Sequence, residues 1–141
     1  MPREADASVL AFDFGTRRIG VAVGNTLTRI AHPLATIDAR EAASGLASIA
    51  TLCDEWRPAR LVVGLPVHAD GTPHAMTARA RGFAAELGQR FGVPVTLVDE
   101  RWTSESARDR LQGAGRAGRA RRDEVAAQII LQAWFDEPHD A

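Results

Sequence analysis

Acidic residues stand at the ends of several predicted elements that lie far apart in the chain. Asp13 ends a first apolar run, Asp99 and Glu100 follow a later one, and Asp123 begins the last helical pattern. Neighbouring carboxylates repel one another and burial raises the cost of each charge, so a cluster of them needs a compensating cation. The four histidines have no ligand spacing. Oxygen ligands alone favour Mg²⁺ or Mn²⁺ over zinc, so the pattern predicts a site for one of these ions.

Each of these acids also has an ordinary structural interpretation. Asp123 could cap the helix that it begins, and Asp13 could form the turn that follows it. Asp99 and Glu100 could be solvated loop charges. These interpretations are independent of one another, whereas a single site accounts for all of the acids together. We therefore expect Asp13, Glu100 and Asp123 to be the catalytic and metal-binding residues.

The elements that must position these acids are indicated by hydrophobic periodicity. Five short apolar or alternating segments predict strands at residues 8–14, 18–24, 28–37, 60–66 and 93–98. The first two form an antiparallel hairpin across a Gly-Thr-Arg turn. Pro33 has no N–H to donate, so the third strand is expected to be bulged or at an edge. The fourth is apolar throughout, which is typical of a central strand.

Helical spacing predicts helices over residues 39–56 and 76–91, a short helix from Thr103 or Ser104, and a last helix from about Asp123 to Phe135. This order predicts an α/β fold, a mixed five-stranded sheet with helices on both faces. Ligands of such sheets collect at the carboxyl ends of neighbouring central strands, which would bring the acids together. We expect one domain over residues 1–141, with a core of about 8–135 and an acidic tail, 136–141.

The charge of the chain is unevenly distributed. The 141 residues carry a formal net charge of −1, and all 17 basic residues are arginines. Residues 101–122 have a net charge of +5 and residues 123–141 one of −5. Clustered arginines favour phosphate ligands, although a solvated loop is the simpler alternative. No apolar stretch is long enough for a membrane span, and the start carries no secretory signal, so a cytoplasmic protein is expected.

Four ordered motifs carry a resemblance to a known family: DFGTRRIGVAVGN, VVGLPVHADGT, LVDERWTSESA and RRDEVAAQIILQ. They resemble the motifs of the YqgF family of pre-16S rRNA nucleases, also called RuvX and related to the RuvC Holliday-junction resolvases. The resemblance covers about residues 8–135. It implies a ribonuclease H-like fold, and it places the family's metal-binding acids on Asp13, Glu100 and Asp123.

The resemblance implies a metal-dependent nuclease that hydrolyses phosphodiester bonds, with processing of the 5′ end of precursor 16S rRNA as the expected function. Residues 113–122 are expected to form a mobile basic flap that orders on nucleic acid. We also expect a set of residues to bind the phosphates of the nucleic acid. They are Gly15, Thr16, Arg17, Arg101, Arg116, Arg119, Arg121 and Arg122.

Three other functions fit parts of the sequence. A Holliday junction resolvase-type DNA endonuclease would act on branched DNA, and it would need a stable two-fold dimer. A non-catalytic ribosome-maturation or nucleic-acid-binding adaptor would not need acids facing phosphate. A phosphate-binding ATPase of the actin and sugar-kinase type would need two lobes, and this chain supplies one. The expected partners are precursor rRNA or branched or single-stranded DNA, and ribosomal precursor particles, with the chain as a monomer or weak homodimer.

Overall fold

A computed structural model describes residues 7–66, 70, 72, 75–100 and 119–137. Its five strands form one sheet in the order β3-β2-β1-β4-β5. The strands are β1 (Ser8–Asp13), β2 (Arg18–Asn25), β3 (Ala31–Asp38), β4 (Arg60–Leu65) and β5 (Val95–Asp99). The described helices are α1 (Ala42–Trp56), α2 (Thr77–Phe91) and α4 (Arg119–Asp136). None of these helices is long and apolar enough to cross a membrane.

The sheet is mixed, as predicted. β1 pairs antiparallel with β2, β2 pairs antiparallel with β3, and both β1 and β5 pair parallel with β4. The nearly continuous apolar run of β4 therefore lies between two strands and is buried from Leu61 to Leu65. The parallel pairing brings the carboxyl ends of β1, β4 and β5 to the same edge.

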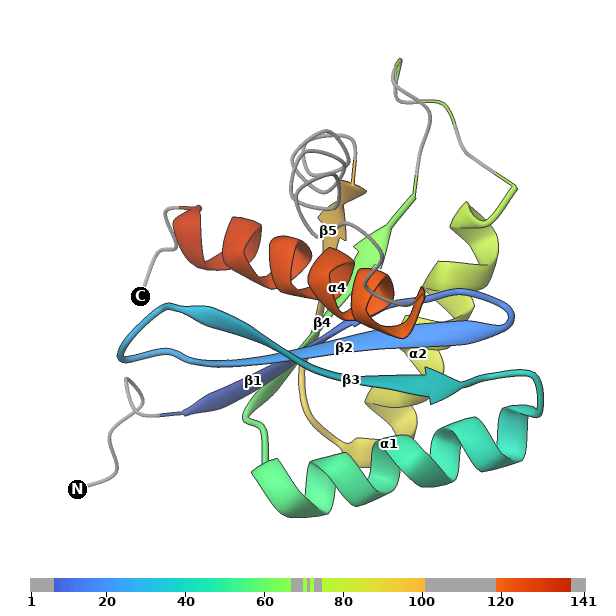
Figure 1. Cartoon of the computed structure of the whole chain (residues 1–141), viewed down its shortest axis with the longest axis horizontal. Coiled ribbons are helices and arrows are strands. Elements are labelled where there is room, and N and C mark those ends of the chain that lie inside the picture. The colour runs from blue at the N-terminus through green and yellow to red at the C-terminus, as the bar shows by residue number, and fades with distance from the viewer. Residues whose placement is uncertain (1–6, 67–69, 71, 73–74, 101–118, 138–141) are drawn as a thin grey trace.

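Two hydrophobic layers cover the sheet, and strand alternation assigns each side chain to one of them. In β1, Leu10 and Phe12 face α1 and α2, and Phe12 meets Phe83 of α2 edge-on. The alternate residues Val9 and Ala11 belong to the second layer, which α4 covers. Figure 1 shows α4 crossing one side of the sheet while α1 and α2 lie on the other side. Helices on both faces are therefore confirmed.

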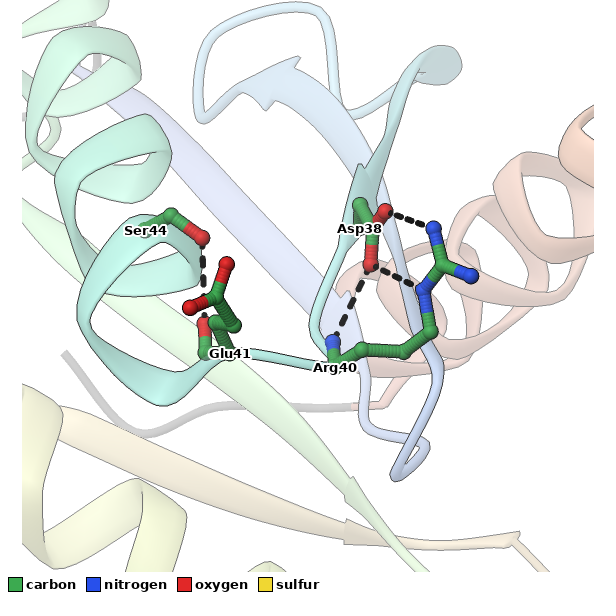
Figure 2. A network of polar contacts seen from close by, with 4 residues as sticks. All are labelled: Asp38, Arg40, Glu41 and Ser44. Carbon is green, nitrogen blue, oxygen red and sulfur yellow. Dashed lines mark hydrogen bonds and ion pairs between the residues drawn. The ribbon is translucent and has the colours of Figure 1, made fainter.

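The third strand is an edge strand with a bulge, as Pro33 predicted. Val21 pairs with Ala35 while Ala22 pairs with Pro33, so Leu34 is the extra residue on β3. After β3 the chain turns sharply before α1, and Figure 2 shows the polar contacts of this turn.

The turn after β3 shortens the first helix relative to the prediction. The Asp38 carboxylate accepts hydrogen bonds from the Arg40 backbone N–H and from its guanidinium, which holds the pKa of Asp38 at about 2 (Figure 2). Because this contact holds the chain in a turn, α1 begins at Ala42, and the prediction of a helix from residue 39 was wrong.

The last helix begins earlier than predicted. α4 starts at Arg119, so residues 119–122 are helical and the prediction that they belong to a mobile loop was wrong. These residues are Arg-Ala-Arg-Arg, all strong helix formers, which explains the extension. Asp123 is consequently inside the helix and does not cap its start. Residues 113–118 of the predicted flap, and the predicted helix from Thr103 or Ser104, lie outside the described residues.

Candidate active site

Asp13 is placed at the carboxyl end of β1 on the side of the sheet that α4 covers. It pairs with Gly20 of β2 and follows Val9 and Ala11 on the same face of the strand. The neighbouring Phe12 pairs with Val63, so Asp13 also lies beside the end of β4. A carboxylate in this position is flanked by the two strands that frame the candidate site.

Asp123 reaches the same region from α4. The helix lies so close to β2 that a Cβ atom at Gly20 would overlap the backbone carbonyl of Asp123. Glycine at this position therefore allows the helix to approach the sheet. The Asp123 carboxylate accepts a hydrogen bond from Arg18 Nε at 2.6 Å, and the two side chains are 19% and 39% exposed, respectively. Glu124, the next acid, turns away and accepts a hydrogen bond from Thr36 of β3.

Glu100 approaches from the other side, directly after β5. A Cβ atom at Gly64 of β4 would be 2.8 Å from Glu100 Oε2 and 2.5 Å from Ile130 Cδ1 of α4. The carboxylate of Glu100 therefore lies over the bare backbone of β4, beside the packed face of α4. Two glycines on two strands thus make room for two acids at one edge of the sheet.

Asp13 and Glu100 lie in surroundings that disfavour their ionised forms. Burial, with the charge of Asp123 as the second cause, raises the pKa of Asp13 to about 7. Burial also raises the pKa of Glu100 to about 8, and the charges of Asp13 and Asp99 add to this effect. The charge of Asp123 thus acts on Asp13, and the charge of Asp13 acts on Glu100. Negative charge is costly at this edge, which is the condition that a bound cation would relieve.

The three acids offer suitable ligands for a divalent metal ion, but they are not arranged as a finished cage. Within the described part of the chain, no three His, Cys, Asp or Glu side chains are grouped so that they could hold a metal ion. Asp123 instead pairs with Arg18. The donors are all oxygens, as Mg²⁺ and Mn²⁺ prefer, and burial, with neighbouring acids as the second cause, raises the pKa values of Asp13 and Glu100, so a cation would stabilise their ionised forms. The residues therefore fit such an ion if Asp123 changes partner.

The turn residues expected to contact nucleic acid are at the same end of the sheet. Gly15 and Thr16 line a cavity of about 370 Å³ between the β1–β2 turn, α1 and α2, on the face opposite the carboxylates. Arg17 has an exposed side chain, and its backbone carbonyl accepts the N–H of Ala39 at 2.8 Å. The turn is therefore anchored to the end of β3.

The expected arginine contacts near α4 are only partly described. Arg122 is exposed in the first turns of α4. Arg119 and Arg121 belong to the helix, and their side chains lie outside the described residues, as do Arg101 and Arg116 entirely. The proposed phosphate contacts of these residues remain predictions.

Sequence reasoning missed three residues of this region: Arg18, Gly20 and Gly64. Arg18 was overlooked because an arginine at the start of a strand gives no sequence signal for a carboxylate 105 positions away. The two glycines did carry a signal, since an isolated glycine inside an apolar strand often marks a close approach of another backbone or side chain. The sequence does not identify the approaching group.

Gly20→Ala is expected to lower the free energy of unfolding by about 2 kcal/mol or more, because the new methyl group must push α4 away from β2. It should also reduce any activity that depends on Asp123. Gly82→Ala is the matched control, because nothing lies within 4 Å of a Cβ at this exposed helical position. That variant should gain roughly 0.5–1 kcal/mol. Chemical denaturation gives the free energy of unfolding of both variants. A Gly20→Ala variant as stable as the original protein would contradict the close contact between α4 and β2.

Comparisons with known proteins bear on both the family and the fold. A family model described as RuvX, Holliday junction resolvase, matches residues 7–137. A protein of Dechloromonas aromatica named "Putative pre-16S rRNA nuclease" is 53% identical over 135 residues, which are 94% of this chain and 92% of the relative. A protein of the same name from Chromobacterium violaceum is 54% identical over 136 residues, covering 94% and 99% of the two chains.

Solved structures with the same fold include Holliday-junction resolvases. RuvC from T. thermophilus, in complex with a Holliday junction substrate, aligns with a TM-score of 0.57 at 18% identity, covering 92% of this chain and 93% of that one. The yeast mitochondrial Holliday junction resolvase Ydc2 aligns with a TM-score of 0.56 at 12% identity, covering 95% and 80%. The ribonuclease H-like fold expected from the sequence is confirmed.

Proposed function

Because the chain belongs to the RuvX family, we propose that it is a divalent-metal-dependent nuclease that hydrolyses phosphodiester bonds, with precursor 16S rRNA as its substrate. One observation carries the proposal. Acids from β1, from the end of β5 and from α4 approach one edge of the sheet, where burial and then neighbouring negative charge raise the pKa values of Asp13 and Glu100. A protein that only binds nucleic acid gains nothing from negative charge facing phosphate.

Asp13, Glu100 and Asp123 would hold the cation. A bound Mg²⁺ or Mn²⁺ supplies Lewis-acid polarisation of the phosphoryl oxygen, a lower pKa for the attacking water and stabilisation of the leaving oxygen. A Cβ at Gly15 would be 2.6 Å from the Arg18 carbonyl, so glycine here allows the tight β1–β2 turn, whose exposed Thr16 would be available to a phosphate at the same end of the sheet. Arg17 and Arg122 are exposed near this edge and would fix the position of the nucleic-acid backbone, together with Arg101, Arg116, Arg119 and Arg121.

The choice of RNA over a DNA junction is the finer part of the proposal. The two relatives at 53–54% identity carry a name that refers to precursor rRNA, which favours RNA and an activity in the cytoplasm. The description of the matching family model favours the second candidate, a Holliday-junction endonuclease. Such an enzyme must cut two symmetric strands and therefore needs a two-fold dimer.

A cleavage panel distinguishes these substrates. Purified protein with Mn²⁺ or Mg²⁺ is expected to cut precursor 16S rRNA fragments or single-stranded RNA at least about tenfold faster than a four-way DNA junction, a difference of roughly 1.4 kcal/mol in barrier height. Sedimentation of the same sample should give a monomer or a weak dimer. A tight dimer with paired symmetric cuts in the junction would reverse the choice. No cleavage of any substrate would contradict the nuclease itself.

A further inference from the structure

Arg18 forms an ion pair with Asp123, one of the proposed metal-binding acids. Its Nε donates to Asp123 Oδ2 at 2.6 Å, which is the short distance of a charge-assisted hydrogen bond. The Arg18 side chain is 39% exposed and the Asp123 side chain is 19% exposed. The arginine therefore keeps more access to solvent than the acid that it pairs with.

The position of this pair is fixed by the surrounding fold. Arg18 lies two residues before Gly20 on β2, so both residues face the α4 side of the sheet. Gly20 meets the Asp123 backbone directly, which sets the distance between strand and helix. Arg18 also pairs in register with Asp38 of β3, and Asp38 is occupied by its own contacts with Arg40. The Arg18 guanidinium consequently pairs with Asp123 of α4.

A divalent metal ion at the acid cluster would compete with this arginine. Asp13 pairs with Gly20 of β2, and Gly20 touches the backbone of Asp123, so a cation shared by these acids would approach the carboxylate that Arg18 contacts. The two cations repel each other, so a carboxylate gains less from both together than the sum of what each would give alone. Metal binding and the Arg18 contact are therefore linked, and each weakens the other.

We propose that Arg18 is a positioning residue with two partners: it neutralises Asp123 in the metal-free protein, and metal binding displaces its guanidinium onto a phosphate of the substrate. This proposal rests on the proposed nuclease function. It predicts that the metal-loaded protein binds nucleic acid more tightly than the metal-free protein does.

Metal affinity gives the first test. In Arg18→Gln the competing charge is gone, so calorimetric titration with Mn²⁺ should show binding that is roughly fivefold to tenfold tighter than in the original protein. Arg18→Lys keeps the charge and should stay close to the original affinity. Arg60→Gln is the control for loss of a structural arginine, because Arg60 bonds Thr96 and contacts the Trp134 ring at the far end of the sheet. It should leave Mn²⁺ affinity unchanged.

Nucleic-acid binding gives the second test, with single-stranded RNA as the probe. In EDTA, Arg18 is held by Asp123, so Arg18→Gln and the original protein should have the same dependence of affinity on salt. With Ca²⁺ in place of the catalytic metal, the original protein should show a log–log salt slope steeper than that of Arg18→Gln by about 0.7, the value for one phosphate contact on a single strand. Arg60→Gln should show no such metal-dependent difference.

A measurement on the unmodified protein keeps the proposal testable if Arg18→Gln does not fold. The Nε–H proton of Arg18, assigned by its loss in Arg18→Lys, should exchange slowly with solvent without metal and faster once Mg²⁺ is added. Unchanged exchange, or equal or weaker Mn²⁺ binding by a folded Arg18→Gln, would show that the ion pair is only structural. If the original protein bound no Mn²⁺ at all, the proposed function would fail as well.

Discussion

Asp13→Asn is expected to reduce metal-dependent cleavage by on the order of a thousandfold or more, which corresponds to about 4 kcal/mol of transition-state stabilisation. Asparagine keeps the shape of the side chain and removes the charge that would hold the cation. Glu100→Gln and Asp123→Asn should have effects of similar size, because the three acids would share one ion. The measurement is the initial rate of RNA cleavage in Mn²⁺ or Mg²⁺ at saturating substrate.

Asp38→Asn provides the matched control for this loss. It makes the same chemical change at the same end of the sheet, but Asp38 is exposed and bonds to Arg40 in the turn before α1. Its cleavage rate should stay within about twofold of the original, since surface substitutions of this kind have small effects. Two results would contradict the assignment of the acids: Asp13→Asn with normal activity, or cleavage by the original protein that persists in excess EDTA.

The second large effect concerns stability, and its sign is opposite to that of most substitutions in a buried region. Asp13→Asn should raise the free energy of unfolding of the metal-free protein at pH 8 by on the order of 2–4 kcal/mol, or roughly 5–10 °C in melting temperature. The pKa of Asp13 is raised from its ordinary 3.8 to about 7, mainly by burial and then by Asp123. Its ionised form therefore costs stability in the folded state.

The pH dependence follows from the same shift. A carboxyl whose pKa is higher in the folded state binds its proton more tightly there, so its favourable contribution is fully present below about pH 4 and is lost as pH rises through about 7. Glu100 adds a second loss that extends to about pH 8. The melting temperature of the metal-free protein should thus fall between pH 4 and pH 8 as the contributions of Asp13 and Glu100 are lost. Asp13→Asn should remove the part of this fall that comes from Asp13.

Metal addition completes this experiment. Mn²⁺ should raise the melting temperature of the original protein at pH 8 and do so much less at pH 5, because protons then compete for the same oxygens. Asp13→Asn should show little metal-induced shift at either pH. Asp38→Asn should behave like the original protein toward metal. A lower melting temperature for metal-free Asp13→Asn would mean that the charge of Asp13 is stabilised by a group not identified in the candidate site.

Much of the fold could be predicted because its signals are local. The alternation of β1 and β2, the apolar run of β4 and the helical spacing of α1 and α2 each reflect which face is buried. Pro33 predicted the bulged edge strand because a proline cannot donate a sheet hydrogen bond. Asp13 and Glu100 could be assigned to one edge because parallel strands place their carboxyl ends together.

The start of α4 and the partner of Asp123 could not be predicted in the same way. The glycine-rich sequence before residue 119 suggested a loop, and nothing local indicated that Arg-Ala-Arg-Arg would continue the helix backwards. The Arg18–Asp123 pair depends on how closely α4 packs on β2, which is a property of the assembled fold. Tertiary contacts between residues so distant in the chain leave no periodic pattern in either segment.

The contact between Gly20 and the backbone of Asp123 also determines at which stage of folding the candidate site can form. Arg18 and Asp123 are 105 positions apart, so the chain must close a very long loop before they meet. A partly folded molecule with all five strands paired but α4 undocked would have Asp13 and Glu100 without Asp123. Detachment of this single helix would therefore take the site apart while the sheet stayed paired, so the proposed cleavage would depend on the local stability of α4 as well as on that of the whole protein.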